Sequence, residues 1–544
     1  MCNGGVLQHW QVKCLDELMK LDFVEPVLTI SQKPAEEKKT FIKKILTYRY
    51  SRLLYRAYKR VHKLNWQQAR ELPHYLKPVE TIVCTINKKG IYSEYFSVGD
   101  IETIRSYKLD FIIRFGFNII RGDILDAARY GVWSYHHGDE EKYRGGPPAF
   151  WEVHRNEHVC GTILQRLTNK LDSGIVLKKG YFGVTNHSYN ATLGNVYAQS
   201  ASWIKQVCID LQNGVAHYLN NAPSNTTAKV YTYPGNFTML LFGLRKIGRK
   251  LRFHWHDLFR PESWLVGLIQ NETGFEPGKK LSKQITWFNH ASKSAYYADG
   301  FVVLNDRYHY LFVEEYDYAT GKGVIASFDL QTCKKQTLIE EPHHLSYPFS
   351  FVHNGKIYVL PEAAGSGKIT LYVVNPLSNL IVSKTVLMEN VHAYDPTLFE
   401  YAGKWWLFVT HKETGSNTSL HIYYAQHLTG PYAPHANNPV KTDIGSARPA
   451  GNIFCVNGVY YRPAQNCSRT YGGSVVIHKI IRLNEYVYHE EKHDEILPNQ
   501  VHEKATGIHT LTTQGKLVAF DLKRPWYNGA NFRKKLAKKL KLSK

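Results

Sequence analysis

The spacing of apolar residues changes character near residue 261. Up to about residue 230, short apolar runs alternate with stretches in which apolar residues recur every three or four positions, a pattern typical of an α/β layer fold. The runs predict strands over 23–30, 81–86, 110–117 and 132–136, and the periodic stretches predict helices over 7–20 and 121–130. Such alternation favours parallel strands joined by crossover helices.

Beyond residue 261 the chain consists of short aromatic strands separated by turn residues, and this pattern repeats. Segments that begin at Asp299, Tyr347 and Asp395 align with a step of 48 residues, and looser copies follow near Asn452 and His509. A period near 50 with several short strands in each copy is typical of a propeller blade. We therefore expect five blades; a β-sandwich is the alternative.

Length and composition agree with a multi-domain protein. The chain has 544 residues, of which 43% are hydrophobic and 13% aromatic, so it can bury more than one core and is not disordered as a whole. We predict an α/β domain over 1–230, a basic linker over 231–260, a five-bladed β-propeller over 261–525 and a basic amphipathic tail over 526–544.

The formal charge of +22 is concentrated in two segments. Residues 38–63 carry ten Lys or Arg and residues 531–544 carry seven, with no acid in either segment. Local basic segments suit a phosphate-rich surface, either a membrane or RNA. The tail places Phe532, Leu536 and Leu540 among lysines at helical spacing, which favours peripheral contact with an anionic membrane; a solvated end is the simpler interpretation. Because little excess charge remains elsewhere, nucleic acid is a less favoured partner.

The cysteine pattern and the absence of long apolar runs bear on the compartment. Eight cysteines show no metal-finger spacing and no disulfide framework, so we expect reduced thiols and no metal site. The sequence shows no apolar run of membrane-spanning length and no signal-peptide pattern at its start. We therefore expect a cytoplasmic protein that can sit at the inner face of the membrane.

The most distinctive stretch of the first region is GVWSYHHGDEEKYRG at 131–145, followed by CGTIL at 160–164 and LDSG at 171–174. These segments, in this order, resemble the catalytic domain of the folate-dependent formyltransferases, a family that includes methionyl-tRNA formyltransferase and the sugar N-formyltransferases. The resemblance covers roughly residues 2–220. It implies a Rossmann-like α/β formyltransferase domain and 10-formyltetrahydrofolate as co-substrate.

The resemblance also assigns roles to residues. His136 matches the family's catalytic histidine, Asp172 its catalytic aspartate, and Ser134 stands where the family has an asparagine. Possible contacts to substrate or cofactor are His137, Asp139, Tyr143, Arg144 and Gly145. When an amine attacks a formyl carbon, the formyl oxygen gains negative charge and the nitrogen loses a proton, so oxyanion donors and a base must converge. Ser134 offers one hydroxyl in place of a carboxamide, and His137 is a candidate second donor.

Two features depart from the family's pattern. Asp139, Glu140 and Glu141 form an acidic run, which is either a solvated loop or an attractor for an aminium substrate. Met1 stands at the turn that follows the family's first strand. The resemblance therefore implies either further chain upstream or a sheet that has lost a strand.

The propeller region resembles the N-terminal domain of plant glucosamine inositolphosphorylceramide transferase and, more distantly, five-bladed glycoside hydrolases of the arabinanase and xylosidase type. The motifs are ADGF at 298–301, LPE at 360–362, YDP at 394–396 and ARPAG at 447–451. The likeness implies four candidate residues at the propeller axis: Asp299, Glu362, Asp395 and Arg448. They suit hydrolysis or binding of a glycan, and they equally suit the capping of turns. Trp405 and Trp406 suit either sugar stacking or blade packing.

Together the two resemblances predict a transferase. It would move a formyl group from 10-formyltetrahydrofolate to an amine, an amino sugar or glycan precursor in surface polysaccharide biosynthesis. The alternative is an altered formyltransferase-like protein that binds or hydrolyses glycans through its propeller. Formylation of tRNA is disfavoured, because a propeller follows where that enzyme's resemblance would continue into a small barrel.

Overall fold

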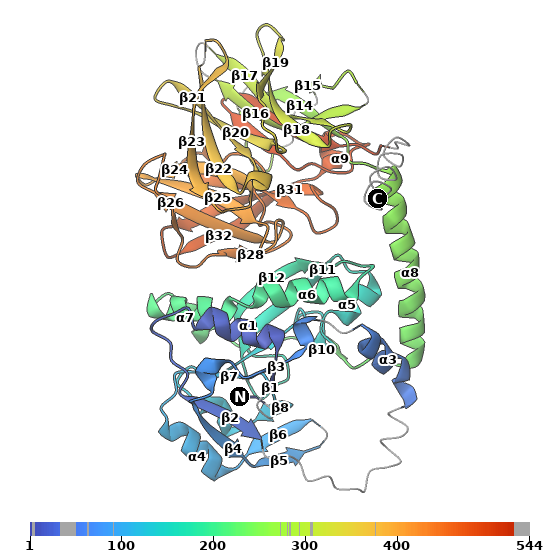
Figure 1. Cartoon of the computed structure of the whole chain (residues 1–544), viewed down its shortest axis with the longest axis vertical. Helices are drawn as coiled ribbons and strands as arrows, with labels where there is room; N and C mark the ends of the chain where they lie inside the picture. The colour runs from blue at the N-terminus through green and yellow to red at the C-terminus, as the bar shows by residue number, and fades with distance from the viewer. Residues whose placement is uncertain are drawn as a thin grey trace. The chain divides into compact units, whose positions relative to one another are not determined.

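The computed structural model describes residues 1–2, 6–32, 50–62, 65–90, 92–271, 274–279, 281, 284–292, 294–304, 308–375 and 377–526. The chain divides into two compact units, the α/β unit Met1–Lys250 and the propeller unit Leu251–Lys544 (Figure 1). The predicted amphipathic tail beyond residue 526 lies outside the described residues, as does half of the basic segment 38–63.

The main sheet of the α/β unit has the order β12-β11-β9-β7. Its strands are β7 (Ile112–Ile113), β9 (Val132–His136), β11 (Val159–Arg166) and β12 (Ile175–Gly183). The strand predicted over 132–136 has the observed bounds, whereas the one predicted over 110–117 contains only two ladder residues. β7 and β9 are parallel, but β9, β11 and β12 pair antiparallel, so the expectation of an all-parallel sheet is wrong for its second half.

The remaining parallel strands form separate small sheets. β2 (Leu28–Gln32) pairs with β4 (Glu80–Cys84), and β6 (Ser93–Phe96) pairs with β8 (Ile119–Arg121) and, antiparallel, with β5 (Ile86–Lys89). Met1 and Cys2 lie between β2 and β7: the Cys2 N–H donates to the Ile30 carbonyl, and the amino group of Met1 donates to the Ile113 carbonyl. β2 and β7 are therefore connected through these two residues and not through a shared ladder.

Two short ladders complete the strands of the α/β unit. β1 (Val6–Gln8) pairs antiparallel with β3 (Ala69–Glu71). β10 (Arg144–Gly145) pairs parallel with β13 (Val230–Tyr231).

The helices of the α/β unit cover its main sheet. Besides α1 (His9–Leu18), they are α3 (Leu53–Val61), α4 (Val98–Ser106), α5 (Phe150–Arg155), α6 (Tyr189–Ser200) and α7 (Trp203–Gln212). α1 confirms the helix predicted over 7–20 and buries Trp10, Cys14 and Leu18 in the largest apolar core. The helix predicted over 121–130 is instead a single 3₁₀ turn, Asp123–Asp126, because Gly122 and Gly131 at positive φ bound the segment.

The propeller unit contains five antiparallel sheets, each with a path of four strands, as the repeat predicts. The first sheet contains β16 (Ala295–Leu304), β17 (His309–Asp317), β18 (Lys322–Asp329) and β19 (Lys335–Ile339). The second contains β20 (Ser346–His353), β21 (Lys356–Glu362), β22 (Lys368–Asn375) and β23 (Leu380–Glu389). The third contains β24 (Ala393–Tyr401), β25 (Lys404–His411), β26 (Ser419–Ala425) and β27 (Ala433–Pro434), and β28 (Lys441–Thr442) also pairs with β26. The fourth is β29 (Phe454–Val456), β30 (Val459–Asn466), β31 (Ser474–Leu483) and β32 (Tyr488–Ile496), which the short helix α9 (Pro498–Val501) follows.

The fifth sheet takes its strands from both ends of the propeller sequence. β14 (Trp264–Gln270) and β15 (Ile285–Phe288) pair with β34 (Leu517–Lys523) and β33 (Leu511–Gln514) in the order β15-β14-β34-β33. The ladder between β14 and β34 therefore joins the first strand of the unit to its last, so this sheet links the two ends of the propeller sequence.

The 48-residue step reproduces one backbone irregularity in three sheets. Asp299, Tyr347 and Asp395 each have a positive φ, at 53°, 43° and 48°. At each of them the ladder between the first two strands of the sheet skips residues. A bulge of this kind turns a side chain out of the regular alternation. All three side chains are buried.

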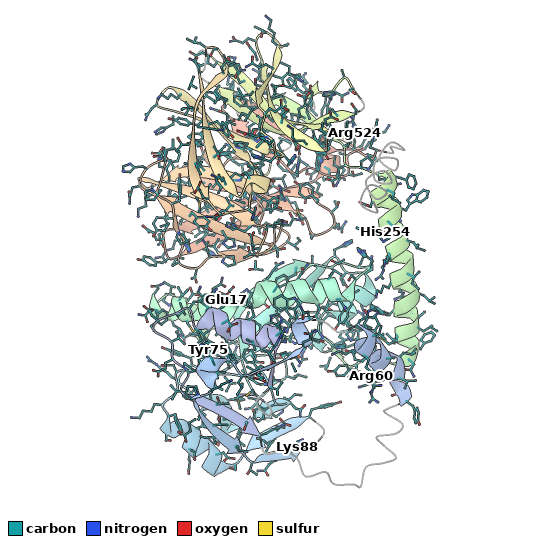
Figure 2. All side chains as sticks on the ribbon, in the orientation of Figure 1. Glu17, Arg60, Tyr75, Lys88, His254 and Arg524 are labelled. Atoms are coloured by element: carbon teal, nitrogen blue, oxygen red, sulfur yellow. The ribbon has the colours of Figure 1, made fainter. Side chains whose placement is uncertain are left out.

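The stretch predicted as a basic linker is largely helical: α8 spans Asn236–Phe259. Figure 2 labels His254 in its C-terminal half. No helix in the described part of the chain is both long and apolar enough to cross a membrane.

All eight cysteines are free thiols; six are buried, and Cys333 and Cys455 are exposed.

Candidate functional site

A cavity of about 260 Å³ opens beside the ends of β9 and β11 in the α/β unit. Its lining includes four polar side chains that bear on chemistry, His136, Asp172, Arg114 and Gln165, together with His137 and Gly145. The residues come from β9, β11, the turns that follow these two strands and, for Arg114, the segment after β7. The segments that carry the formyltransferase resemblance thus contribute to one concave surface.

His136 is held with one ring nitrogen committed and the other facing Asp172. Its Nε2 lies 2.8 Å from the carbonyl oxygen of Tyr143, and because a carbonyl only accepts, Nε2 carries the hydrogen. Its Nδ1 faces Oδ1 of Asp172 at 3.4 Å. The side chains of His136 and Asp172 are only 9% and 11% exposed. Nδ1 is therefore the nitrogen at which a proton can be exchanged.

Asp172 is fixed by the loop that follows β9. It adopts a positive φ of 47°, and its Oδ2 accepts a hydrogen bond of 2.8 Å from the Gly145 N–H. Arg144 donates to the Leu171 carbonyl at 2.5 Å. A Cβ on Gly145 would lie 2.2 Å from the Tyr231 carbonyl oxygen, so this position requires glycine. Arg144 and Gly145 act by placing the carboxylate.

The structure places two donors at the cavity that sequence reasoning missed. Arg114 donates from Nη1 to Ser134 Oγ at 2.9 Å, and Gln165 lies directly across from Ser134 in the β9–β11 ladder. The Gly174 N–H donates to Gln165 Oε1, which leaves the amide nitrogen as the donor end. Ser134 is buried and does not line the cavity. Burial lowers the pKa of Arg114, and Asp172 acts in the opposite direction; a guanidinium stays charged in either case.

His137 is a neutral member of the wall. Burial lowers its pKa to about 3, so the ring is uncharged near neutral pH. It packs edge-on against Trp10 and Tyr197 and stacks on Tyr135. Its Nε2 is buried without a hydrogen-bond partner among the described residues. The ring lines the cavity as predicted for a substrate contact, but it offers no charge.

In the acidic run, Asp139 and Glu140 are buried against Lys179, whereas Glu141 is exposed. Lys179 lies within 3.1 Å of Asp139 and of Glu140 and 3.0 Å from Glu141. Asp139 and Glu140 are buried, and neither lines the cavity. Tyr143 likewise lies outside the lining, with its hydroxyl on Glu157. The ammonium group of Lys179 occupies the position that an aminium ligand would take.

A second cavity, of about 660 Å³, lies in the propeller unit. Acidic groups line it at Asp299, Glu314 and Glu362, and cations line it at Arg448 and His509. Aromatic rings complete the wall: Trp264, Tyr296, Tyr316, Tyr318 and Tyr471. By contrast, Trp405 and Trp406 are buried in the packing between strands, so they do not contribute to this surface.

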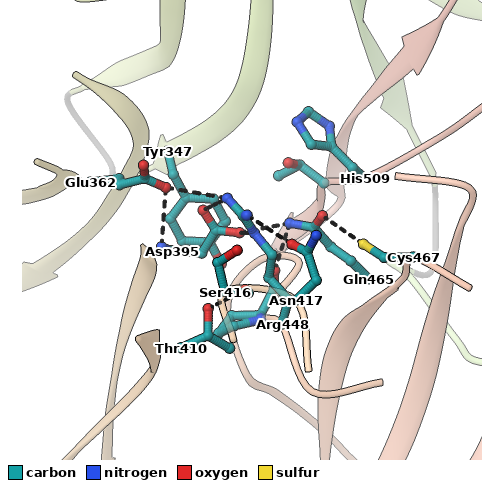
Figure 3. Close-up of polar contacts among 12 residues, drawn as sticks. Tyr347, Glu362, Asp395, Thr410, Ser416, Asn417, Arg448, Gln465, Cys467 and His509 are labelled. Carbon is teal, nitrogen blue, oxygen red and sulfur yellow. Dashed lines mark hydrogen bonds and ion pairs between the residues drawn. The ribbon is translucent and has the colours of Figure 1, made fainter. Parts of the chain in front are cut away.

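Arg448 neutralises Asp395 and reaches Glu362 (Figure 3). Its Nε donates to Asp395 Oδ2 at 2.5 Å and its Nη2 to Asp395 Oδ1 at 2.9 Å, while Nη2 also lies 3.3 Å from Glu362 Oε2. Gln465 donates to the same Asp395 carboxylate at 2.6 Å. Burial opposes the charge on Arg448, but Asp395 raises its pKa. Asp395 is thus fully bonded and does not line the cavity.

His509 is a second fixed cation. Its Nδ1 lies 2.6 Å from Asp521 and its Nε2 lies 3.4 Å from Asp299, and its ring stacks on Trp264 at 3.9 Å between centroids. Burial alone would lower the pKa of His509, but Asp521 and Asp299 raise it to about 9. The imidazolium is therefore held between two carboxylates and on an aromatic face, which favours the charged form.

Glu314 is the least satisfied acid of this cavity. It is 5% exposed, and no hydrogen bond joins it to another described residue; its nearest charged neighbour is His344 Nε2 at 3.8 Å. Burial, followed by the neighbouring carboxylates of Asp299 and Glu362, raises its pKa well above the usual range. Sequence reasoning missed Glu314, His509 and Asp521. The sequence does mark His509, because the fifth copy of the repeat begins at that residue.

Parts of the chain are similar in sequence to known proteins. Residues 284–511 match a family described as glucosamine inositolphosphorylceramide transferase 1, N-terminal. Over 208 residues the chain is 33% identical to the transferase of that name from Oryza sativa subsp. japonica, covering 36% of this chain and 28% of the relative. The relative from Arabidopsis thaliana is 32% identical over 259 residues, covering 42% of this chain and 33% of that one. The chain therefore spans about a third or less of these relatives.

Other similarities are more limited. A methionyl-tRNA formyltransferase from Clostridium perfringens is 31% identical over 98 residues, covering 18% of this chain and 31% of that protein. Among solved structures, an exo-β-1,3-galactanase from Clostridium thermocellum matches with a TM-score of 0.32 and 13% identity, covering 42% of this chain and 67% of that one.

Proposed function

We propose that the α/β unit is a Rossmann-like formyltransferase domain that transfers a formyl group from 10-formyltetrahydrofolate to the amine of an amino sugar or glycan precursor. The observation that carries the proposal is the His136–Asp172 pair beside Arg114 and Gln165 in one cavity. The partial identity to a methionyl-tRNA formyltransferase supports it independently. The protein is accordingly a one-carbon transferase.

The cavity fits the reacting groups of such a co-substrate. Its volume of about 260 Å³ suits a formyl group, its nearest atoms and an amine, and it is smaller than a site for the whole folate. The buried Nε2 of His137, which has no partner among the described residues, provides a polar atom for a ligand. His136, His137, Arg114 and Gln165 are the residues that would hold the formyl end. Bound there, 10-formyltetrahydrofolate would supply an activated one-carbon group.

Each group of the site has a distinct task in that reaction. The acceptor amine bonds to the formyl carbon, and the bond from that carbon to the folate nitrogen breaks. His136 Nδ1 takes the proton that leaves the amine and returns it to the departing nitrogen. Asp172 stabilises the imidazolium while it exists. The guanidinium of Arg114 and the amide of Gln165 donate to the oxygen on which negative charge develops.

A direct test uses the purified full chain with 10-formyltetrahydrofolate and a panel of amino sugars and amino-sugar nucleotides. We expect tetrahydrofolate release and a formamide product by mass spectrometry. Loss of acid–base assistance in His136→Gln or Asp172→Asn should lower kcat by roughly a hundredfold or more. Glu102→Gln, on the exposed side of α4, is the matched control. Absence of both turnover and folate binding would overturn the proposal.

The alternative function, hydrolysis of glycans by the propeller, has weaker support. Two carboxylates must flank a glycosidic bond, one as acid and one as base or nucleophile. Asp395 is neutralised by Arg448 and does not line the cavity. Release of sugar from a glycan by wild type, abolished in Asp299→Asn and retained in His136→Gln, would favour this alternative over formyl transfer.

A further inference from the structure

The buried part of the propeller cavity carries more acid than the cations buried with it neutralise. Arg448 is paired with Asp395, and the imidazolium of His509 is paired with Asp521. Three buried acids of the wall remain, Asp299, Glu362 and Glu314; the exposed Asp257, Arg260 and Glu262 and the half-buried His344 also line the cavity. Glu362 receives only two long contacts, from Arg448 and from the Asp395 N–H, at 3.3 and 3.4 Å. Glu314 receives no hydrogen bond from the described residues and faces the cavity while 95% buried.

A buried acid whose carboxylate accepts no hydrogen bond, and whose nearest cation lies 3.8 Å away, costs stability unless it serves a ligand. An ammonium group has one positive charge and three N–H donors, so it can pair with Glu314 and donate to other oxygens of the wall. Burial first, and also repulsion from neighbouring carboxylates, raises the pKa of Asp299, Glu314 and Glu362. A bound cation would relieve that mutual repulsion. The wall is thus complementary to a cation that donates several hydrogen bonds.

The rest of the wall suits a sugar ring. Tyr296, Tyr316 and Tyr318 lie in mutual ring contact, and Trp264 and Tyr471 lie beside His509. Aromatic faces stack on the C–H surface of sugars, and their hydroxyls bond sugar hydroxyls. The volume of about 660 Å³ admits a sugar unit with its neighbours. A divalent metal is a poorer fit to the Asp299, His509 and Asp521 group, because His509 already supplies a positive charge between those carboxylates.

We propose that the central cavity of the propeller binds an unacylated amino-sugar unit through its ammonium group, with Glu314 as the selecting residue. The claim concerns binding by the propeller and does not require formyl transfer. Where it operates together with the proposed function, it separates substrate from product, because formylation removes the positive charge from the amine. The cavity would therefore retain the unformylated sugar and release the formylated one.

The test is binding of simple aminohexoses to the full chain. Glucosamine, galactosamine, mannosamine and a short glucosamine oligomer are compared with their N-acetyl counterparts by calorimetry. At least one free amine should bind about tenfold or more tightly than its N-acetyl form, the effect of losing a charged hydrogen bond. Glu314→Gln should remove that preference while leaving binding of the N-acetyl sugar unchanged. Formyl transfer is assayed separately in the same variant, so failure of one proposal is distinguishable from failure of the other.

Glu315→Gln is the matched control, because Glu315 is adjacent in β17 but bonds Lys335 and His290 and does not line the cavity. Thermal unfolding of both variants reports folding. N-acetyl sugars that bind as well as free amines, or equal losses in Glu314→Gln and Glu315→Gln, would overturn the proposal. Binding of Ca²⁺ or Zn²⁺ alone that Glu314→Gln removes, without amine preference, would replace it with a metal site.

A different observation concerns α8. Five apolar residues recur on it with alternating steps of three and four, and each is between 55% and 73% exposed: Phe237, Leu240, Leu244, Ile247 and Leu251. We call them the α8 stripe. Spacing of this kind places side chains on one helix face. Met239 and Phe242, which lie on another face, are buried in the core of the α/β unit, so the stripe is not the face that packs there.

Basic residues accompany the stripe. Arg245, Lys246, Arg249, Lys250 and Arg252 lie within eight residues, and α8 has a single acid, Asp257. Arg245, Lys246 and Arg249 turn toward the α/β unit, where their partners are uncharged groups of His154, Tyr58 and Val153 that do not cancel their charge. Lys250 and Arg252 are the remaining cations of this set. If a second copy of this helix packed on the stripe, the basic residues of the two copies would lie close together and repel each other. An anionic lipid surface instead offers both an apolar phase and the opposite charge.

From this charge complementarity we infer that the α8 stripe docks on an anionic membrane surface. The full chain should sediment with vesicles that contain phosphatidylserine and much less with phosphatidylcholine alone, and added salt should weaken the binding. Replacing two stripe residues in Leu244→Gln/Ile247→Gln should reduce partitioning by about a hundredfold, because two buried apolar side chains are lost. Val98→Gln, an exposed apolar position on α4, is the control.

The basic tail is present in every variant, so the comparison isolates α8. Unchanged vesicle binding in the double variant would overturn the inference. So would a concentration-dependent dimer that the double variant abolishes in the absence of vesicle binding, which would assign the stripe to a second copy of the chain.

Discussion

The two cavities use the same side-chain chemistry for different purposes. In the α/β unit, one ring nitrogen of His136 is committed to a carbonyl and the other faces a single carboxylate at 3.4 Å. In the propeller, His509 lies between two carboxylates and on Trp264, and its pKa is raised to about 9. A histidine with one committed nitrogen can exchange a proton, whereas a histidine held by two acids is a fixed charge. The surroundings, and not the residue type, separate a proton carrier from a structural cation.

The largest effect should come from removing the cation that both Asp395 and Glu362 share. Arg448→Ala leaves two buried carboxylates without their guanidinium, and such a loss costs about 3–5 kcal/mol of unfolding free energy. Urea unfolding of the full chain, followed in the propeller transition, measures it. Arg482→Ala, at an exposed position on β31, is the control. A loss below about 1 kcal/mol would mean that water enters the Arg448 network and solvates it.

The corresponding loss in the α/β unit should appear in rate and not in stability. Arg114→Gln keeps a hydrogen-bond donor but removes the charge beside the developing oxyanion, so kcat for formyl transfer should fall by roughly a hundredfold. KM for the acceptor should change little, since the contact strengthens only in the transition state. Steady-state kinetics separate the two parameters. A purely raised KM would make Arg114 a binding residue.

His509 predicts that the protein loses stability in alkali. The folded-state pKa of His509 lies above its unfolded value of 6.5, so its contribution to stability is complete below pH 6.5 and is lost as pH rises through about 9. The loss should reach about 3 kcal/mol. Asp299, with a pKa raised to about 6, completes its titration below most of this window. Unfolding free energies measured between pH 7 and 10 should slope downward in wild type and less steeply in His509→Gln, where the raised pKa of Glu314 and Glu362 still contributes.

The sequence predicts the elements that local pattern controls. The 48-residue repeat identifies five sheets because each blade must reproduce its own turns, and the resemblance pairs His136 with Asp172, whose side chains lie 3.4 Å apart. It does not predict which side chains meet across strands. Gln165 lies across from Ser134 through the β9–β11 register, Arg114 reaches Ser134 from the segment after β7, and Lys179 reaches Asp139 from β12. The sequence of β17 gives no sign that Glu314 differs from other strand residues. Glu314 faces a cavity because the five sheets of the propeller surround one.

The smallest effect should follow from the substitution that the sequence alone marks as critical. Ser134 stands where related enzymes have an oxyanion donor, yet it is buried, lies outside the cavity lining and accepts a hydrogen bond from Arg114. Arg114 is also oriented by the carbonyls of Gly116 and Phe117. Ser134→Ala should therefore lower kcat less than about tenfold, the cost of one positioning hydrogen bond. If Ser134→Ala lowers kcat as much as Arg114→Gln does, the Ser134 hydroxyl itself donates to the oxyanion. Arg114 would then be the residue that positions that hydroxyl.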